Sequence, residues 1–272
     1  MWYDLGLDLK LYLHLVAVQI RSQFQYKANL ILDIVTYFSV TGIELLSILL
    51  YFGVFPTLLN WHIGDVALLA SVTSFCFGMA EMLGSGIDDF SSVIVRGDFD
   101  RMLLRPVGTF IQLVGSDFRL RRLGRMTQGL LGGVVALHFL PGLHWTWTKM
   151  LVLALGMLSG AVMFVAILLL GATLCFWTVE TDEIVNILTY GGRELLSYPL
   201  TIYNQLMQRF FLFIVPIAFG SYVPVCYVLG KPLPFGLPAA SAFFSPLAAL
   251  ILATAAGLLW KFGVRHYQST GS

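Results

Sequence analysis

Long runs of apolar residues, separated by polar stretches, dominate the hydrophobic pattern of this chain. Each run approaches the roughly 20 residues that an α-helix needs to cross the hydrocarbon core of a bilayer. Six runs qualify, at about residues 29–53, 64–84, 126–142, 149–178, 203–229 and 240–260. The third is short and rich in glycine, and the fourth contains a G-x-x-x-G pair, Gly156 and Gly160, which permits close packing of helices within the chain. The pattern predicts an all-α integral membrane protein with six transmembrane helices.

The segment before the first run has apolar residues at helical spacing. Over residues 9–24 a helix would collect on one stripe Leu9, Tyr12, Leu13, Val16, Ile20 and Phe24. Leu5 to Leu15 also alternate, so a β-strand is an open alternative. Beside a membrane, a helix lying in the interface with its apolar side inward fits better. We expect an amphipathic cytoplasmic helix within residues 1–27, a single membrane domain over 28–262 and a cytoplasmic tail over 263–272.

The connection between the second and third runs is far longer than a turn. Its second part starts at Pro106, a residue suited to the first position of a helix. An apolar face follows, formed by Val107, Phe110, Ile111, Val114 and Phe118. This pattern predicts an amphipathic helix that ends in Arg119, Arg121 and Arg122, because cations stabilise a helix C-terminus.

Composition supports a membrane protein and excludes several soluble classes. Of the 272 residues, 58% are hydrophobic and 11% are charged, whereas a soluble domain carries roughly a quarter charged residues. Sixteen basic and 15 acidic residues give a formal net charge of +1, which excludes an electrostatic nucleic-acid binder. The 3 cysteines lie too far apart in the sequence for a disulfide framework or a zinc site.

The distribution of Lys and Arg predicts the orientation of the helices. With the N-terminus in the cytoplasm and six crossings, Lys149 and Lys231 are the two of the 16 basic residues that fall outside. Arg193 and Arg209 count among the cytoplasmic ones, at the entry to the fifth span. This asymmetry follows the positive-inside rule, so both termini are expected in the cytoplasm. An internal span is expected to direct insertion, because no basic-flanked leader precedes the first run.

Motifs for independent catalysis are missing from the sequence. It contains no G-x-x-x-x-G-K-[ST] phosphate loop, no H-E-x-x-H metal motif and no G-x-S-x-G nucleophile elbow. Its 5 histidines are scattered. We therefore expect no catalytic residue, no metal site and no cofactor in this chain.

The first run carries a polar stripe along an otherwise apolar helix. Asp33 and Glu44 are separated by eleven positions, and at 100° per residue they return to within about 20° of one direction. Nearly the same line holds Asn29, Thr36 and Ser47. Charged groups at membrane depth usually face protein or an aqueous path. The stripe therefore lines a substrate path or a subunit interface, or it consists of hydrogen-bonded packing residues. Glu81, at the cytoplasmic end of the second run, is expected to pair with the arginines that follow it.

Prolines predict breaks around the fifth run. Pro199 disfavours helix at Tyr198, so a break is expected there. Pro216 lies within the run and, with Pro224 farther out, should kink or break the helix. Residues 230–238, GKPLPFGLP, include Pro234 and are expected to form an irregular outer segment.

One stretch resembles a family signature. Residues 95–107, VRGDFDRMLLRPV, resemble the pattern (I/V)-x-x-G-x-x-D-x-x-L-L-R-P of bacterial ABC transporter permeases of the type-2 exporter superfamily. The matching positions are Gly97, Asp100, Leu103, Leu104, Arg105 and Pro106. Residues 198–203 leading to 214–216, and the tail 262–269, agree as well. Together these stretches span most of the chain in the right order.

The resemblance implies a half-transporter in the bacterial inner membrane. Such permeases have six spans, a connecting helix before the first, cytoplasmic coupling helices between the second and third, and re-entrant helices between the fifth and sixth. On this model residues 88–125 dock on an ATPase, and the expected contacts are Asp88, Asp89, Arg96, Gly97, Asp98, Asp100, Arg101, Arg105 and Pro106. The re-entrant exit segment would include Pro216, Pro224 and Pro234.

The resemblance also implies partners and a substrate class. Two copies of an ABC ATPase would bind ATP and Mg²⁺, and a second permease, related or identical, would complete the assembly within membrane lipid. Exported substrates would be hydrophobic or amphipathic, including drugs, natural products and organic dications of the viologen type. The expected path or dimer interface is the stripe on the first span.

Two other functions stay open at this point. An ion-coupled secondary transporter would use Asp33 and Glu44 to carry protons, although the two halves of the chain show no evident repeat and the arginine-rich connection is then unexplained. A membrane scaffold or assembly factor without transport activity is the second alternative.

Overall fold

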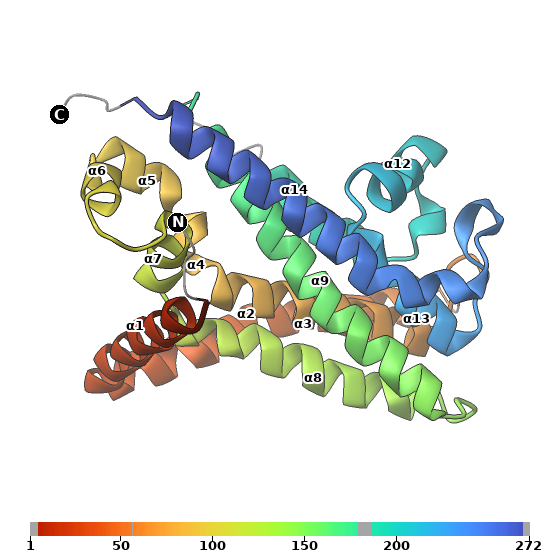
Figure 1. Ribbon diagram of the computed structural model, residues 1–272. Coiled ribbons are helices and arrows are strands. Elements are labelled where there is room, and N and C mark those ends of the chain that lie inside the picture. The colour runs from red at the N-terminus through yellow and green to blue at the C-terminus, as the bar shows by residue number, and fades with distance from the viewer. Residues whose placement is uncertain (1–4, 56, 179–185, 269–272) are drawn as a thin grey trace.

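The computed structural model describes residues 5–55, 57–178 and 186–268, and these form an assembly of helices (Figure 1). The long helices are α1 (Leu5–Gln25), α2 (Lys27–Val54), α3 (Ile63–Leu83), α8 (Leu123–His138), α9 (Trp147–Leu174) and α14 (Ser245–His266). The short helices are α4 (Ser85–Asp88), α5 (Phe90–Val95), α6 (Asp98–Leu103), α7 (Thr109–Ser116), α11 (Gly192–Leu196), α12 (Gln205–Arg209) and α13 (Tyr222–Leu229). The 3₁₀ or π-helical turns are η1 (Leu120–Arg122), η2 (Ile187–Gly191), η3 (Leu200–Ile202), η4 (Phe210–Ile214), η5 (Ile217–Phe219), η6 (Pro234–Gly236) and η7 (Ala239–Phe244). The all-α prediction is confirmed for this part of the chain.

Helix α3 forms the centre of the molecule. Its apolar residues are not confined to one side, and a helix of that kind is stable where protein or lipid surrounds it. It packs against α8 and α9, and α9 packs in turn against α14. Phe77 of α3 meets Phe164 of α9 edge to face, with ring centroids 5.1 Å apart, and both side chains are almost completely buried.

Three described helices are long and apolar enough to cross a membrane. They are Ile63–Leu83, Trp147–Leu174 and the continuous stretch Ala239–His266, which correspond to the second, fourth and sixth predicted spans. The last continues beyond residue 262, the predicted end of the membrane domain. A fourth crossing results if one bent pair of helices counts as a span. Helices α2 and α8 coincide with the first and third predicted spans, and six crossings stay a prediction.

The bent pair lies where the prolines predict a break. Gln205–Ile214 and Ile217–Leu229 meet at an angle of 76°, and Pro216 stands at the break, where it lacks the N–H that would continue the helix. The chain also breaks at Tyr198–Pro199, as predicted. Pro224, by contrast, lies in the first turn of α13. A first-turn N–H needs no partner within the helix, so the prediction of a break there is wrong.

The G-x-x-x-G pair of α9 accommodates this bent segment. A methyl group on Gly160 would stand 3.1 Å from the Cα of Gly220, and one on Gly156 would stand 2.4 Å from the Pro224 ring. The two glycines therefore allow close approach within one chain, as the sequence predicts.

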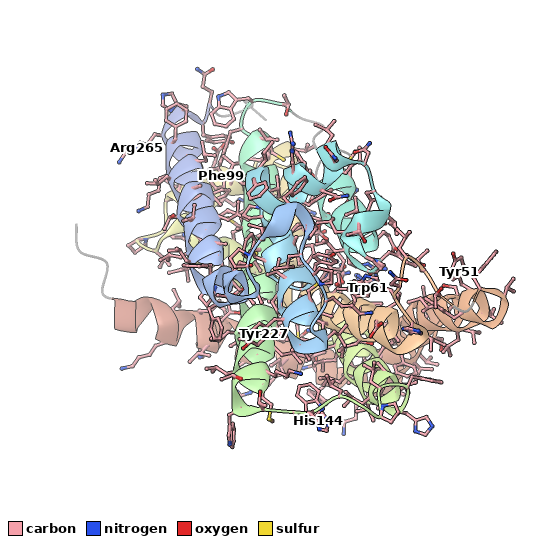
Figure 2. All side chains as sticks on the ribbon, turned by 90° about the vertical axis from the view of Figure 1, so that its right-hand side faces the viewer. Tyr51, Trp61, Phe99, His144, Tyr227 and Arg265 are labelled. Carbon is pink, nitrogen blue, oxygen red and sulfur yellow. The ribbon has the colours of Figure 1, made fainter. Side chains whose placement is uncertain are left out.

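The α2–α3 connection is fixed to the segment that follows α13. Lys231 Nζ lies 2.8 Å from Asp65 Oδ2 and donates a hydrogen bond to the Asn60 carbonyl at 2.7 Å. Beside them the ring of Trp61 stacks on Tyr222 with centroids 5.9 Å apart. Figure 2 views this end of the molecule and labels Trp61. The contacts join residues far apart in sequence at the end opposite α4–α7.

Helix α1 settles the choice between helix and strand for the N-terminal segment. Leu5–Gln25 is helical, and the chain turns at Tyr26 before α2 begins. Helix α1 packs on α7, where Gln19 donates a side-chain hydrogen bond to the Ser116 carbonyl at 2.8 Å. The predicted helix is confirmed, and the strand alternative is wrong.

The predicted helix from Pro106 to Arg122 is wrong at both ends. Helix α7 begins at Thr109, because the Gln112 side chain donates to the carbonyls of Met102 and Val107 at 2.9 Å each and holds residues 104–108 in a loop. It ends at Ser116, and Asp117 is extended. The arginines that follow therefore lie beyond the helix.

Arg209 lies apart from the other basic residues of the predicted cytoplasmic group. Its guanidinium is 5.4 Å from the centroid of the Phe235 ring, in the segment between α13 and α14. Residues 187–202 already run along α3, as a 3.1 Å hydrogen bond from Thr73 Oγ1 to the Leu196 carbonyl shows. The chain thus reaches the end opposite α4–α7 before residue 209 (Figure 1). Grouping Arg209 with the arginines of residues 96–125 on one side is therefore wrong, and the side on which each group lies stays a prediction.

Candidate functional site

Helices α4–α7 form a separate cluster at one end of the bundle, on the side where α1 and the last turn of α14 also lie (Figure 1). Aromatic side chains hold the cluster in place. Phe90 and Phe99 are fully buried, and their rings meet Trp260 of α14 with centroids 5.0 and 6.2 Å away. Between α5 and α6, Gly97 has φ of 69°, a left-handed conformation that other residues rarely adopt. This glycine reverses the chain and brings α6 back against α5.

The outer side of the cluster combines charged and apolar side chains. Asp98 lies 3.2 Å from Arg96 and 3.5 Å from Arg101, and both arginines are exposed. A cleft of about 400 Å³ lies between α5, α6 and the end of α7, and it is lined by Asp89, Arg96, Asp98, Arg101, Arg105 and Asp117 among others. Beside it Leu104 is 86% exposed. We call Val95, Arg96, Asp98, Arg101, Leu103, Leu104 and Arg105 the α5–α6 surface.

The structure brings most of the predicted docking residues to this surface. Arg96, Asp98, Arg101 and Arg105 share the cleft with Asp89, and Pro106 is exposed in the adjoining loop. Gly97 serves as the turn between α5 and α6, and Asp100 is half-buried on α6. Asp88 alone turns toward the bundle, where Arg122 Nη2 lies 3.7 Å from its carboxylate.

A buried group of ionised side chains lies beneath the cluster. Glu81, at the end of α3, forms salt bridges to Arg122 and, at 2.7 Å, to Arg125 Nη1. All three residues are at most 7% exposed. Tyr190 donates a hydrogen bond to Glu81 Oε1 at 2.9 Å. We call Glu81, Asp88, Arg122, Arg125 and Tyr190 the Glu81 cluster.

The Glu81 cluster confirms one prediction and adds a member that sequence reasoning missed. Pairing of Glu81 with the following arginines is as predicted. Tyr190 comes from η2, more than a hundred residues away, and an isolated tyrosine beside Gly191 carries no signal that would reveal this contact. Arg125 also stacks on Phe77, with its guanidinium carbon 5.1 Å from the ring centroid.

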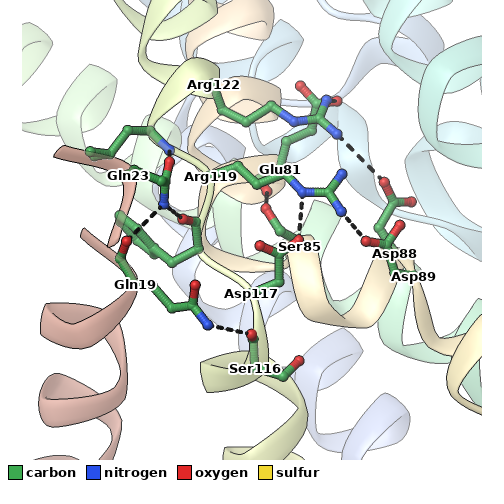
Figure 3. Close-up of polar contacts among 12 residues, drawn as sticks. Gln19, Gln23, Glu81, Ser85, Asp88, Asp89, Ser116, Asp117, Arg119 and Arg122 are labelled. Atoms are coloured by element: carbon green, nitrogen blue, oxygen red, sulfur yellow. Dashed lines mark hydrogen bonds and ion pairs between the residues drawn. The ribbon is translucent and has the colours of Figure 1, made fainter. Parts of the chain in front are cut away.

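Further ion pairs and amide contacts join this cluster to α1 (Figure 3). Arg119 bridges Asp89 and Asp117. Gln23 of α1 accepts a hydrogen bond from the Leu120 N–H at 2.9 Å and donates one to the Phe118 carbonyl. The chain between α7 and α8 is therefore held from both sides, so that α1, α4 and the start of α8 are mechanically connected.

Asp88 carries a shifted pKa, which makes the stability of this region depend on pH. Burial raises the pKa of the Asp88 carboxyl, nearby Glu81 and Asp89 add to the effect, and Arg122 opposes it. The folded protein thus binds this proton more tightly than the unfolded chain does. The charged form costs stability near neutral pH, and the cost falls as the pH drops through the raised pKa.

Replacing Asp88 by asparagine is therefore expected to raise the melting temperature slightly at neutral pH. The difference from the unmodified protein should shrink as the pH falls toward the ordinary range of a carboxyl. Thermal unfolding in detergent over a pH series measures both effects. Asp98→Asn, at a carboxylate on the α5–α6 surface, is the control for loss of a negative charge at this end of the molecule. The prediction would be contradicted if Asp88→Asn were less stable than the unmodified protein at neutral pH and became relatively more stable as the pH fell.

Helix α2 leaves its polar stripe open. Asn29, Asp33, Thr36 and Ser47 are all exposed, and the side chain of Glu44 lies outside the described part of the structure. Apolar side chains around them, such as Ile31 and Val35, are more than half exposed as well. Figure 2 shows α2 with Tyr51 at the edge of the molecule. Packing within the described chain therefore leaves Asn29, Asp33 and Thr36 exposed, whereas Ser47 borders a small cavity with Gln128 and Glu194. A substrate path or a subunit interface along the stripe stays a prediction.

The predicted exit residues lie at the other end. Pro216 marks the 76° break, Pro224 packs against Gly156, and Pro234, itself buried, begins the turn η6. No group of three or more metal-ligating side chains occurs among the described residues.

Comparison with known proteins gives one positive result. A family model described as ABC-2 family transporter protein matches residues 38–271. The match includes α3 to α14 and all but the first part of α2. Comparison with the curated proteins and with the solved structures gives no match.

Proposed function

Because the chain belongs to the ABC-2 transporter family, we propose that it is the permease subunit of an ATP-driven exporter in the bacterial inner membrane. Members of this family are membrane transport components that normally work with an ATPase subunit. The sequence has no phosphate-binding loop of its own. ATP and Mg²⁺ then bind to two copies of a separate ABC ATPase, and this chain supplies the membrane path.

The α5–α6 surface is the observation that carries the proposal. It exposes Leu103 and Leu104 beside Arg101 and Arg105, and Asp98 lies between two of the exposed arginines. A centre of exposed apolar side chains surrounded by charges is the usual composition of a protein–protein interface. These side chains hardly contribute to the fold of the chain, so binding of the ATPase is the role we assign to them.

The Glu81 cluster supports a mechanical role for this end of the molecule. Asp88 of α4 contacts Arg122 of η1, and both Arg122 and Arg125 of α8 form salt bridges with Glu81 of α3. Movement of an ATPase bound to α5–α6 would then be transmitted to α3 and α8 as one rigid unit, because a close-packed interior transmits displacement. In this way ATP hydrolysis on the partner would change the shape of the membrane part.

We place the transport path and the second permease, related or identical, at the open face of α2. Asp33 is exposed on this face, and a carboxylate at membrane depth is stable beside an aqueous path or a cation. The substrate we propose is a hydrophobic or amphipathic compound, cationic in the manner of an amine drug or a viologen. A path between two permeases would bury the apolar side chains that α2 now exposes.

Co-expression with the adjacent genes tests the proposal. The tagged chain is purified in detergent, its partners are identified by mass spectrometry, and ATP-dependent accumulation of a fluorescent organic cation is measured in inverted vesicles. We expect an ABC ATPase in the complex and accumulation that stops when ATP is removed. Accumulation that survives ATP depletion but collapses with the proton gradient would support a secondary transporter instead. A complex without an ATPase, together with normal efflux in a deletion strain, would favour an assembly factor.

A further inference from the structure

An apolar groove of about 580 Å³ runs along the bundle beside the α4–α7 cluster. Helices α1 and α7 form one wall with Tyr12 and Phe110, and α14 forms the other with Gly257 and Lys261. Helices α3 and α9 contribute the rest of the lining, including Val162. The groove lies on α3, α9 and α14, the three helices that are long and apolar enough to cross a membrane. Its surroundings are therefore the acyl chains of a bilayer rather than water.

The lining offers very little for a polar ligand to bind. Its polar side-chain atoms belong to Tyr12, Trp260 and Lys261, and no acidic residue lines it. A peptide segment in such a groove would leave most of its backbone N–H and C=O groups without partners, which is costly in an apolar environment. An organic cation would find a positive charge at Lys261 and no carboxylate. A hydrocarbon chain with an anionic head fits this distribution.

One group at the end of the groove fits that anionic head. Lys261 is exposed in the last two turns of α14, so its ammonium can reach the headgroup region. Its positive charge is complementary to a lipid phosphate, and no acidic residue among the lining competes for it.

The length of the groove agrees with one leaflet of a bilayer. From Ala253 to Lys261 the groove follows α14 for about 12 Å, at 1.5 Å per residue. One leaflet contributes about 15 Å of hydrocarbon. A chain whose head lies at Lys261 would therefore run along the groove for most of its leaflet.

We propose that this groove binds one acyl chain of an anionic glycerophospholipid from the surrounding bilayer. The lipid phosphate pairs with Lys261, and the acyl chain lies against the apolar lining. Because Trp260 lines the groove and packs against Phe90 and Phe99, the bound lipid stabilises the attachment of α5 and α6 to the bundle. The site does not depend on an ATPase partner or on the identity of any exported compound.

Photo-crosslinking in nanodiscs tests the site. The purified chain is reconstituted with phosphatidylglycerol or phosphatidylcholine that carries a diazirine in one acyl chain, and labelled peptides are mapped by mass spectrometry. We expect phosphatidylglycerol to label residues 253–261 and 162–169 at least fivefold more than phosphatidylcholine does. Lys261→Gln should remove this preference, whereas Arg265→Gln, at another cation of α14 that does not line the groove, should keep it.

Variants that fill the groove provide a second test of the lipid site. A Cβ on Gly257 meets nothing within 4 Å, so Gly257→Leu places a side chain in the groove without a backbone clash, and labelling should fall at least fivefold. Ala255→Leu, on an exposed side of the same helix, is the control and should leave labelling unchanged. Val162→Phe fills the groove from α9 and replaces Gly257→Leu if that variant does not fold. Labelling that both filling variants leave intact, or equal labelling by the two lipids, would overturn the proposal.

Discussion

Replacing Glu81 by glutamine is expected to lower the free energy of unfolding by about 3–5 kcal/mol, the usual cost of breaking a buried ion pair from one side. The reason is that Glu81 places its negative charge between the guanidinium groups of Arg122 and Arg125, with all three residues at most 7% exposed. An amide of the same size keeps the packing but removes the charge. Thermal unfolding in detergent and the yield of folded protein measure the loss.

Asp98→Asn is the matched control for this prediction. Its carboxylate also contacts two arginines, Arg96 and Arg101, but the three side chains are 38%, 64% and 81% exposed. Solvent screens such pairs, so their loss should cost less than about 1 kcal/mol. A combined variant, Glu81→Met with Arg122→Leu and Arg125→Leu, should recover much of the stability, since apolar replacement of a whole buried ionic group is often tolerated. Equal effects of Glu81→Gln and Asp98→Asn would show that burial of the Glu81 cluster does not govern stability.

The elements that the sequence predicts well are those decided by local pattern. Helices α3, α9 and α14 follow from long apolar runs, and the break at Pro216 follows from a missing N–H. The pairing of Glu81 with the arginines that follow it is also local in origin, because the end of a membrane helix and the adjacent basic connection must lie close together. In each case the physical cause acts within a short stretch of chain.

The errors arise where distant contacts decide the local structure. Pro106 has the right chemistry to start a helix, yet the Gln112 side chain binds the carbonyls of Met102 and Val107 and the helix starts later. Arg209 carries the positive charge that is typical of a cytoplasmic residue. Residues 187–202, however, run along α3, so the chain reaches the end opposite α4–α7 before residue 209. No periodicity in the sequence reports these two contacts, because each depends on an arrangement that forms only in the folded chain.

In the α5–α6 surface, too, the sequence predicts the local feature and misses what depends on distant contacts. The signature around Gly97 identifies the segment, and the left-handed turn at this glycine explains its presence. The signature does not predict which of the expected docking residues point outward. Asp88 and Asp89 are neighbours at the start of the expected docking segment, residues 88–125, but Asp88 faces Arg122 and the bundle, whereas Asp89 lines the outer cleft. Asp88 is thus better assigned to the rigid connection than to the ATPase contact.

Leu104→Asp is expected to abolish most ATP-driven transport while the protein folds normally. Leu104 is 86% exposed, so its replacement removes almost no packing within the chain. At an interface with the ATPase, the same change would bury a charge where an apolar side chain belongs. The few hot-spot residues near the centre of an interface cost about 2 kcal/mol or more when changed, and for Leu104 we expect a loss of that size, which corresponds to roughly 30-fold weaker binding. Co-purification of an ABC ATPase from the co-expressed complex, ATPase activity and vesicle transport should all fall together.

The controls for this prediction separate binding from folding. Leu59→Asp changes a leucine that is 62% exposed at the end opposite α4–α7, and it should leave ATPase binding and transport unchanged. The melting temperature of Leu104→Asp without the ATPase should match that of the unmodified chain, because the side chain has so few contacts to lose. Should Leu104→Asp retain the ATPase and transport at the original rate, the α5–α6 surface would not be the docking site. A loss shared equally by Leu59→Asp would point instead to a general effect of added charge on assembly in the membrane.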